Sequence, residues 1–199
     1  MNFICEGIDR IGKDSLINGI INSLGYFNIF HKQAPEVNQY YSDLALKLKL
    51  SFPNANLYMY QCESFISDMV MLKQAEVKQF NLIMNRSWIG EAVYAKRYRG
   101  YDGNFVFDLE KISGIDKLDK TLLVLLYTSS FDFIKDDGKS LDFSKKEEEQ
   151  KDFIEAFNRS IIKHKLMLDV HDGSGGFVRP EKLLDVVIKA YNEGEQLDD

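Results

Sequence analysis

Short apolar runs and amphipathic stretches alternate along most of the chain. Apolar runs rich in β-favouring residues predict strands over residues 2–6, 26–30, 80–85, 121–127 and 165–170. Apolar residues at helical spacing predict helices over residues 13–24, 38–50, 54–77, 87–98 and 180–191. The run at 121–127 (TLLVLLY) is the clearest strand, because its continuous apolar character is typical of a strand buried on both faces.

This alternation predicts an α/β fold with three α/β/α layers and a five-stranded parallel sheet. Right-handed crossovers would gather the loops that follow the strands at one edge of that sheet. Residues 131–150 are rich in Asp, Lys and Glu and lack an apolar period, so we interpret them as a small mobile lid and the start of a helix. The acidic tail at about 194–199 is expected to fray. We expect one domain over residues 1–199.

Composition narrows the function classes. The chain has 199 residues with 25 Lys and Arg against 31 Asp and Glu, a formal net charge of −6, which argues against a surface that wraps nucleic acid. No apolar stretch approaches the ~20 residues that span a membrane. The two cysteines, Cys5 and Cys62, indicate a reducing, cytoplasmic setting (the host cytoplasm if the chain is viral). We therefore expect small-molecule partners, without nucleic acid or a membrane.

A glycine-rich segment between the first predicted strand and helix carries the strongest chemical signal. It fits the pattern G-x-x-x-x-G-K, in which Gly7 and Gly12 let backbone N–H groups turn towards phosphate oxygens and Lys13 adds a positive charge. The following helix contributes its positive end. The alternative is a simple glycine turn. The pattern favours a nucleotide-phosphate site made by Gly7, Ile8, Asp9, Arg10, Ile11, Gly12, Lys13, Asp14 and Ser15.

Position 14 departs from that pattern. The pattern ends in Ser or Thr, whose hydroxyl coordinates Mg²⁺, whereas this chain has Asp14. A carboxylate is a stronger ligand for Mg²⁺ but repels a triphosphate when the metal is absent. Asp14 is therefore a candidate metal ligand, or an acid that complements the positive end of the helix.

Two stretches resemble a known family. Residues 3–13 (FICEGIDRIGK) resemble the opening of thymidylate kinases, and Ile83-Met84-Asn85-Arg86-Ser87 followed by Tyr94 resembles their second signature. Residues 88–100 (WIGEAVYAKRYRG) are also similar to thymidylate-kinase-like proteins of bacteriophages. The resemblance implies a P-loop kinase that uses ATP and Mg²⁺ to phosphorylate a deoxynucleoside monophosphate, with dTMP the favoured acceptor, for DNA precursor synthesis.

The resemblance also implies roles for individual residues. Arg86 would hold the acceptor phosphate, Tyr94 would pack under the deoxyribose, and Tyr60 would stack on the base. Asp9 would lie near the acceptor sugar and the metal. The plainer alternatives are a helix-capping arginine, two core or helix-face tyrosines, and a turn-stabilising aspartate.

Arg10 is the candidate catalytic arginine, acting together with Lys13 and Arg86. One subgroup of the resembled family has an arginine in the phosphate loop, and another has basic residues in the lid. Here the lid at 131–150 contains lysines but no arginine. We assign to Arg10 the task of neutralising charge on the transferring oxygens; the alternative is a solvated side chain.

Several positions depart from the family pattern. Asn85 replaces an aspartate, Gln33-Ala34-Pro35 replaces Arg-Glu-Pro, and Glu63-Ser64 replaces Asp-Arg. Lys32, Arg97 or Arg99 are candidates to supply the missing positive charge. Because one acid is lost at position 85 and another gained at position 14, we hypothesise that Asp14 takes over as the Mg²⁺ anchor.

The remaining expectations concern the far end of the sheet and the assembly. The loop at 169–176 is expected to lie beside the adenine of the donor. Related kinases are commonly homodimers, and Phe65, Met69 and Leu72 on the long helix would form either a dimer face or part of the core. The alternatives for function are a kinase for another deoxynucleoside or its monophosphate, and a degenerate nucleotide-binding regulator without turnover.

Overall fold

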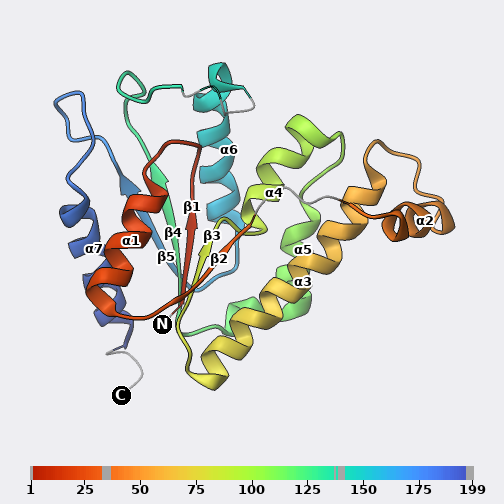
Figure 1. The fold of residues 1–199 in the computed structure, drawn as a ribbon, viewed down its shortest axis with the longest axis horizontal. Coiled ribbons are helices and arrows are strands. Elements are labelled where there is room, and N and C mark those ends of the chain that lie inside the picture. The colour runs from red at the N-terminus through yellow and green to blue at the C-terminus, as the bar shows by residue number, and fades with distance from the viewer. Residues whose placement is uncertain (1, 33–36, 137, 139–141, 196–199) are drawn as a thin grey trace.

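The computed structural model describes residues 2–32, 37–136, 138 and 142–195, and its centre is an all-parallel sheet. The five strands are β1 (Asn2–Glu6), β2 (Asn28–His31), β3 (Leu82–Asn85), β4 (Thr121–Tyr127) and β5 (His164–Asp169). Their order across the sheet is β2-β3-β1-β4-β5, which puts the strand before the glycine-rich segment in the middle (Figure 1). The expected five-stranded parallel sheet is confirmed.

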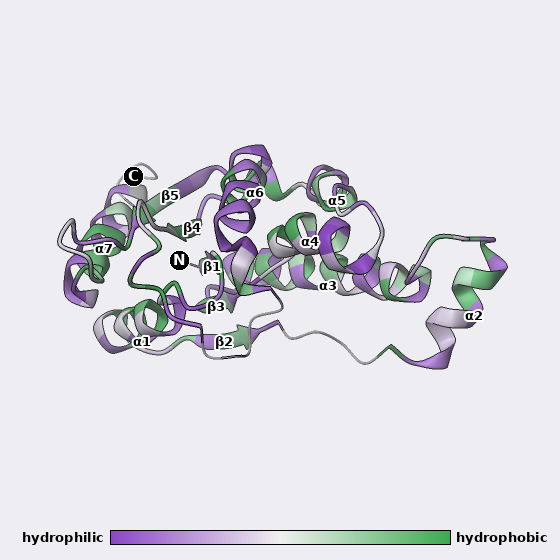
Figure 2. Cartoon of the chain, turned by 90° about the horizontal axis from the view of Figure 1, so that it is seen from above, coloured by the Kyte–Doolittle hydropathy of each residue, from purple (hydrophilic) through white to green (hydrophobic). Residues whose placement is uncertain are grey.

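Helices cover both faces of the sheet. The α-helices are α1 (Lys13–Leu24), α2 (Gln39–Lys47), α3 (Ala55–Lys78), α4 (Ile89–Tyr94), α5 (Phe105–Ser113), α6 (Lys146–Arg159) and α7 (Pro180–Glu195). Helices α1 and α7 pack together on one face, whereas α3, α4, α5 and α6 cover the other (Figure 1). Helix α2 contacts α3 and lies at the end of the molecule farthest from α1 and α7 (Figure 2).

The structure corrects some element boundaries. The helix expected over 87–98 is α4, which continues as a π-helix, η1 (Ala95–Arg99), and α5 was not predicted. Two 3₁₀ turns, η2 (Ile115–Lys117) and η3 (Phe143–Lys145), complete the described elements. The lid segment runs through η3 into α6, as expected for the start of a helix. Residues 137, 139–141 and 196–199 of the predicted lid and tail, and Gln33 to Pro35, lie outside the described residues.

The proposed dimer face on α3 belongs to the core instead. Phe65, Met69 and Leu72 are at most 1% exposed and pack in the cluster that includes the sheet. The exposed apolar side chains of α3 are Ile66, Val70 and Val77, on other faces of the helix. Within the described residues no helix combines the length and the apolar character needed to cross a bilayer.

A buried carboxylate links three segments, namely the start of α4, helix α5 and the end of α6. Glu110 of α5 accepts hydrogen bonds from Trp88 Nε1 (2.7 Å), Ser160 Oγ (2.7 Å) and Ile161 N (2.9 Å). Glu110 and Trp88 have no exposed surface. Because a buried charge needs partners, this cluster fixes the start of α4 against α5 and the end of α6.

Replacing this carboxylate should destabilise the fold. We expect Glu110→Ala to lower the free energy of unfolding by about 3 kcal/mol, since three donors, two of them buried, lose their acceptor. Urea denaturation followed by Trp88 fluorescence measures the change. Asp108→Ala on the exposed face of the same helix is the matched control and should stay within about 0.5 kcal/mol of the parent. Equal effects of the two substitutions would contradict the role given to Glu110.

Candidate active site

The segment after β1 forms a tight loop that only glycine permits at its first position. Gly7 has φ 138°, and a Cβ there would lie 2.6 Å from the carbonyl oxygen of Leu126 in β4. Gly12 has φ 97° and precedes α1, whose first turn is closed by Leu16 N donating to Gly12 O (3.1 Å). Arg10 also has a left-handed backbone, at φ 67°, a conformation that costs energy in a non-glycine residue and is often found at functional sites.

This loop borders a cavity of about 480 Å³ at the carboxyl edge of the sheet. Its walls are Asp9, Arg10, Ile11, Gly12, Lys13, Asp14, Ser15, His31, Asn85 and Arg86. Seven of the nine residues predicted for the phosphate site line it, and Gly7 and Ile8 present backbone carbonyls to Lys13 instead. His31, at the end of β2, was not predicted because nothing in its local sequence marks it.

Lys13 is buried and turned back onto the loop. Its Nζ donates to Gly7 O (2.8 Å) and Ile8 O (2.7 Å). Burial, and then repulsion from Arg86, lowers the pKa of Lys13 to about 8, although Asp9, Glu6 and Asp14 act in the opposite direction. A bound polyphosphate would supply negative charge, so the ammonium form is favoured when an anion occupies the cavity.

Asp14 and Asn85 contact each other at this cavity, as required if Asp14 takes over the role of the acid lost at position 85. Asn85 Nδ2 donates to Asp14 Oδ1 (2.7 Å), and Asn85 Oδ1 is buried without a hydrogen-bond partner. The described residues contain no group of three His, Cys, Asp or Glu side chains placed to hold a metal ion. Mg²⁺ in phosphate sites needs only one or two protein oxygens beside phosphate and water, so the carboxylate and the unpartnered amide oxygen fit that ion.

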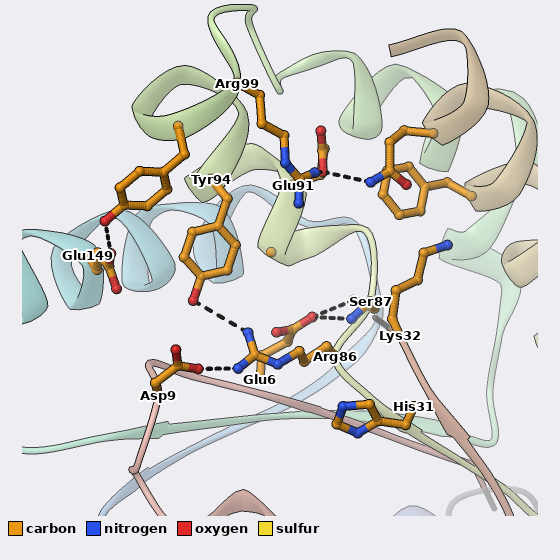
Figure 3. Close-up of a pocket in the computed structure, with 14 residues that line it drawn as sticks. Glu6, Asp9, His31, Lys32, Arg86, Ser87, Glu91, Tyr94, Arg99 and Glu149 are labelled. Atoms are coloured by element: carbon orange, nitrogen blue, oxygen red, sulfur yellow. Dashed lines mark hydrogen bonds and ion pairs between the residues drawn. The ribbon is translucent and has the colours of Figure 1, made fainter. Parts of the chain in front are cut away.

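Arg86 lines both this cavity and a second one of about 290 Å³, which Figure 3 shows. Its side chain forms an ion pair with Asp9 and donates to Tyr94 OH (3.5 Å). Burial works against its charge, but Tyr94 and Asp9 outweigh that effect and raise the pKa of Arg86. The guanidinium therefore stays charged, and Arg86, Asp9 and His31 face both cavities.

The second cavity takes its walls from β1, β2, α3, α4, η1 and α6. It is lined by Glu6, Asp9, His31, Lys32, Gln61, Phe65, Arg86, Ser87, Gly90, Glu91, Tyr94, Tyr98, Arg99 and Glu149. Predicted residues Asp9, Lys32, Arg86 and Tyr94 are therefore brought together.

Tyr60 is not among the residues that line the second cavity. Its ring lies against Tyr41 with centroids 5.3 Å apart, on the side of α3 that meets α2. Phe65 lines the cavity from the same helix, and Lys32 Nζ lies 4.3 Å from the centroid of its ring. Tyr60 and Phe65 point to different sides of α3, because five residues rotate a side chain by about 140° around the helix axis.

Of the two candidate arginines on this part of the chain, Arg99 lines the second cavity. An uninterrupted α-helix would point Glu91 and Arg99 about 80° apart, but the wider π turn of η1 lets Arg99 form an ion pair with Glu91 in the cavity. Arg97 instead lines neither of these two cavities and pairs with Glu148 and Asp152 of α6. Lys32, the other candidate, binds Ser64 Oγ and Asp68 Oδ2, each at 2.6 Å.

Glu6 contributes an unused carboxylate oxygen. Its Oε1 accepts from Ser87 N (2.6 Å) and Ser87 Oγ (2.7 Å), whereas its Oε2 is buried without a partner. Burial raises the pKa of Glu6, although the hydrogen bond from Ser87 and the charges of Arg86 and Lys13 lower it. The sequence marked Glu6 only as the residue before the loop, so its place in the cavity was not predicted.

A third cavity, of about 460 Å³, lies on the other side of the phosphate loop. Its walls are Arg10, Ile11, Gly12, Ser15 and Leu16 together with Val170, Phe177, Val178, Arg179, Pro180 and Leu183. Of the loop at 169–176 that was expected beside the donor adenine, only Val170 lines this cavity, and the other residues on that side belong to 177–183. His171 does not line this cavity; it contacts Ser129 Oγ (3.1 Å) and stacks on Phe133.

Comparison with solved structures shows the fold. YorR of Bacillus subtilis, in complex with phosphorylated GDP, has 16% identity and a TM-score of 0.60, with 98% of both chains covered. Deoxyadenosine kinase of M. mycoides with bound dATP has 19% identity and a TM-score of 0.56, with 96% of this chain and 100% of that chain covered. Thymidylate kinase of Candida albicans has 14% identity and a TM-score of 0.53, with 98% and 92% covered.

Sequence comparison adds no closer relative. No protein-family model matches the chain, and no curated protein sequence matches it. The structural similarities, at these identities, establish the fold that the chain shares with P-loop kinases. The thymidylate kinase resemblance remains a prediction from the two sequence stretches.

The lowered pKa of Lys13 predicts a pH dependence for phosphate binding. Since that pKa is about 8 against 10.5 for an exposed lysine, Lys13 loses its charge as the pH rises through 8. We expect the affinity for a fluorescent ATP analogue to fall by up to about tenfold per pH unit above 8. The reason is that Lys13 must take up one proton before it can bind the anion as an ammonium group.

Equilibrium titrations at pH 7, 8 and 9 measure this dependence. Lys13→Arg is the matched control, since a guanidinium stays charged over this range, and its affinity should change little with pH. Parallel pH profiles for the parent and Lys13→Arg would contradict the assignment to Lys13.

Proposed function

We propose that the protein transfers the γ-phosphoryl group of ATP to a deoxynucleoside monophosphate, with dTMP as the leading acceptor. The observation that carries the proposal is Arg86, which lines both the phosphate-loop cavity and the second cavity. A donor in one cavity and an acceptor in the other would meet at this guanidinium. Arginine suits that position because its planar fork binds phosphate through two hydrogen bonds.

The donor side supplies alignment and positive charge. Amides of the loop and the N-terminal end of α1 would hold the β- and γ-phosphates. Lys13 would leave the carbonyls of Gly7 and Ile8 to contact phosphate oxygens, and Arg10 would neutralise charge on the transferring group. Mg²⁺, held through Asp14 and Asn85 Oδ1, would offset the remaining negative charge of the phosphates.

The acceptor side orients the nucleotide. Arg86 would exchange its ion pair with Asp9 for the acceptor phosphate, and Tyr94 would pack beside the deoxyribose. Asp9, once released, would face the sugar and the metal. Phe65 lines the cavity with Lys32 over its ring, and Lys32 and Arg99 place positive charge on the walls. The acceptor oxygen attacks the γ-phosphorus, and the bond between this phosphorus and the bridging oxygen of ADP breaks. No covalent enzyme intermediate is needed.

A second acceptor, the unphosphorylated deoxynucleoside, is favoured by the charges of the cavity. Arg86, Lys32 and Arg99 already hold Asp9, Asp68 and Glu91 as partners. Glu6 Oε2 is buried without a donor, so it is available to accept the proton of a 5′-hydroxyl. Thymidine and dTMP assayed side by side separate the two acceptors.

Loss of either phosphate-loop cation should stop turnover while the fold survives. We expect Lys13→Ala and Arg10→Ala each to lower kcat about 10³-fold, because charge on the transferring oxygens loses its neutralising partner. The assay follows labelled ATP with dTMP, the other deoxynucleoside monophosphates and the free deoxynucleosides. Arg159→Ala, at an exposed arginine of α6 that lines none of the three cavities described above, is the matched control and should retain activity.

Each outcome of this assay has a defined meaning. Normal dTMP phosphorylation by Arg10→Ala would remove Arg10 from catalysis. ATP binding without product from any acceptor would refute the kinase proposal and select a regulatory nucleotide-binding protein.

The contact between Asp14 and Asn85 predicts a compensating pair. Asp14→Ser should raise the Mg²⁺ concentration needed for half-maximal activity about tenfold or more, because one charged metal ligand is lost. Asp14→Ser combined with Asn85→Asp should recover most of that loss, since the carboxylate returns on the other side of the same contact. A double variant no more active than Asp14→Ser would disprove the exchange.

A further inference from the structure

Two consecutive residues of the π-helix η1 hold the first turns of α6. Arg97 Nε donates to Asp152 Oδ2 (2.7 Å), and its two terminal nitrogens lie 2.6 Å from that oxygen and 3.1 Å from Glu148 Oε2. The hydroxyl of Tyr98 donates to Glu149 Oε1. One turn of η1 therefore contacts three acids on the first two turns of α6.

These contacts determine where Glu149 lies. It is 8% exposed and lines the second cavity together with Tyr98 (Figure 3). Burial raises the pKa of Glu149, whereas the hydrogen bond from Tyr98 lowers it. A buried carboxylate needs partners of this kind. The first turn of α6 is therefore part of the cavity wall only while η1 holds it.

Arg97 acts on this wall from outside the cavity. It lines a separate cavity of about 440 Å³ together with Asp152 and Val93, and neither Arg97 nor Asp152 lines the second cavity. An effect of Arg97 on a ligand in the second cavity must therefore pass through the two helices that it joins, η1 and α6.

The same turns of α6 form the end of the lid. The lid passes through η3 into α6, where the ammonium of Lys146 lies 4.2 Å from the ring centroid of Phe143. Near its start, Phe133 packs edge-on against Phe177 with ring centroids 4.6 Å apart, and Phe177 lines the third cavity. The lid is thus held at its start beside the third cavity and at its end in the wall of the second.

We propose that Arg97 is a positioning residue for the acceptor, because its two acidic partners on α6 keep Glu149 in the wall of the second cavity. Without these contacts the first turns of α6 leave the wall in part of the molecules. The apparent affinity for the acceptor then falls with the fraction that keeps the wall. The other end of α6 stays anchored by Glu110. The inference rests on the proposed role of this cavity as the acceptor site.

Loss of Arg97 should weaken acceptor binding without weakening donor binding. The side chain is 18% exposed and joins two acids, so it contributes more than an isolated surface pair, and Arg97→Ala should raise the Kd of dTMP and thymidine about fivefold or more. The Kd of a non-hydrolysable ATP analogue should stay within about twofold, since Arg97 lines neither cavity beside the phosphate loop. Calorimetric titration of the full chain measures each value.

Further variants locate the effect. Asp152→Asn weakens the same contact from α6 and should also weaken acceptor binding; combined with Arg97→Ala, it should cost less than the sum of the two. Arg97→Lys keeps the charge but loses the planar fork, so its acceptor affinity should lie between those of the parent and Arg97→Ala. Lys96→Ala, at an exposed lysine of the same π-helix, is the matched control and should bind the acceptor like the parent.

The readout compares acceptor and donor affinities on the same variant, so a loss of folded protein affects both alike. If Arg97→Ala does not fold, Asp152→Asn still decides. Unchanged acceptor affinity in Asp152→Asn, equal weakening of acceptor and donor, an equal effect of Lys96→Ala, or no binding of dTMP or thymidine by the parent would overturn the positioning role. Selective weakening of acceptor binding in a protein that phosphorylates neither compound would instead refute the proposed kinase and leave the role of Arg97 standing.

Discussion

The tight passage of the chain at Gly7 is the constraint on which the site depends. The loop leaves β1 so close to the β4 backbone that a single Cβ would lie 2.6 Å from the carbonyl oxygen of Leu126. Because β1 is the central strand, with β3 and β4 on either side, this contact sets the start of α1 over the middle of the sheet edge. Lys13, Asp14 and the left-handed backbone of Arg10 take their positions from it.

Charge balance is the second organising feature. Arg86, Lys32 and Arg99 on the walls of the second cavity each have an acidic partner: Asp9 for Arg86, Asp68 for Lys32 and Glu91 for Arg99. Ion pairs of this kind limit the cost of burying charge in a protein without ligand. Under the proposed function, a phosphate bound by Arg86 would take the place of Asp9, which is the one of these acids that also lines the phosphate-loop cavity. Exchange at Arg86 would thus couple the two cavities.

Much of the fold was predictable because its signals are local. The strand at 121–127 has the bounds of β4, and the start of the first helix and the glycines before it coincide with α1 and its loop. The contact of Asp14 with Asn85 was also anticipated, because parallel strands bring their carboxyl ends to one edge. The π-helix at Ala95–Arg99 was not predicted, since a π turn has no distinct apolar period. Helix α5 was also missed, because no element was assigned between the helix predicted at 87–98 and the strand predicted at 121–127.

The sequence by itself determined the glycine-rich loop, because its glycines, lysine and flanking strand and helix are contiguous and act through the backbone. Only the tertiary structure decided which side chains line the second cavity: Phe65 rather than Tyr60, and Arg99 rather than Arg97. These choices depend on helical phase and on a π turn. Such contacts arise from packing between elements, and no local spacing in the chain encodes them.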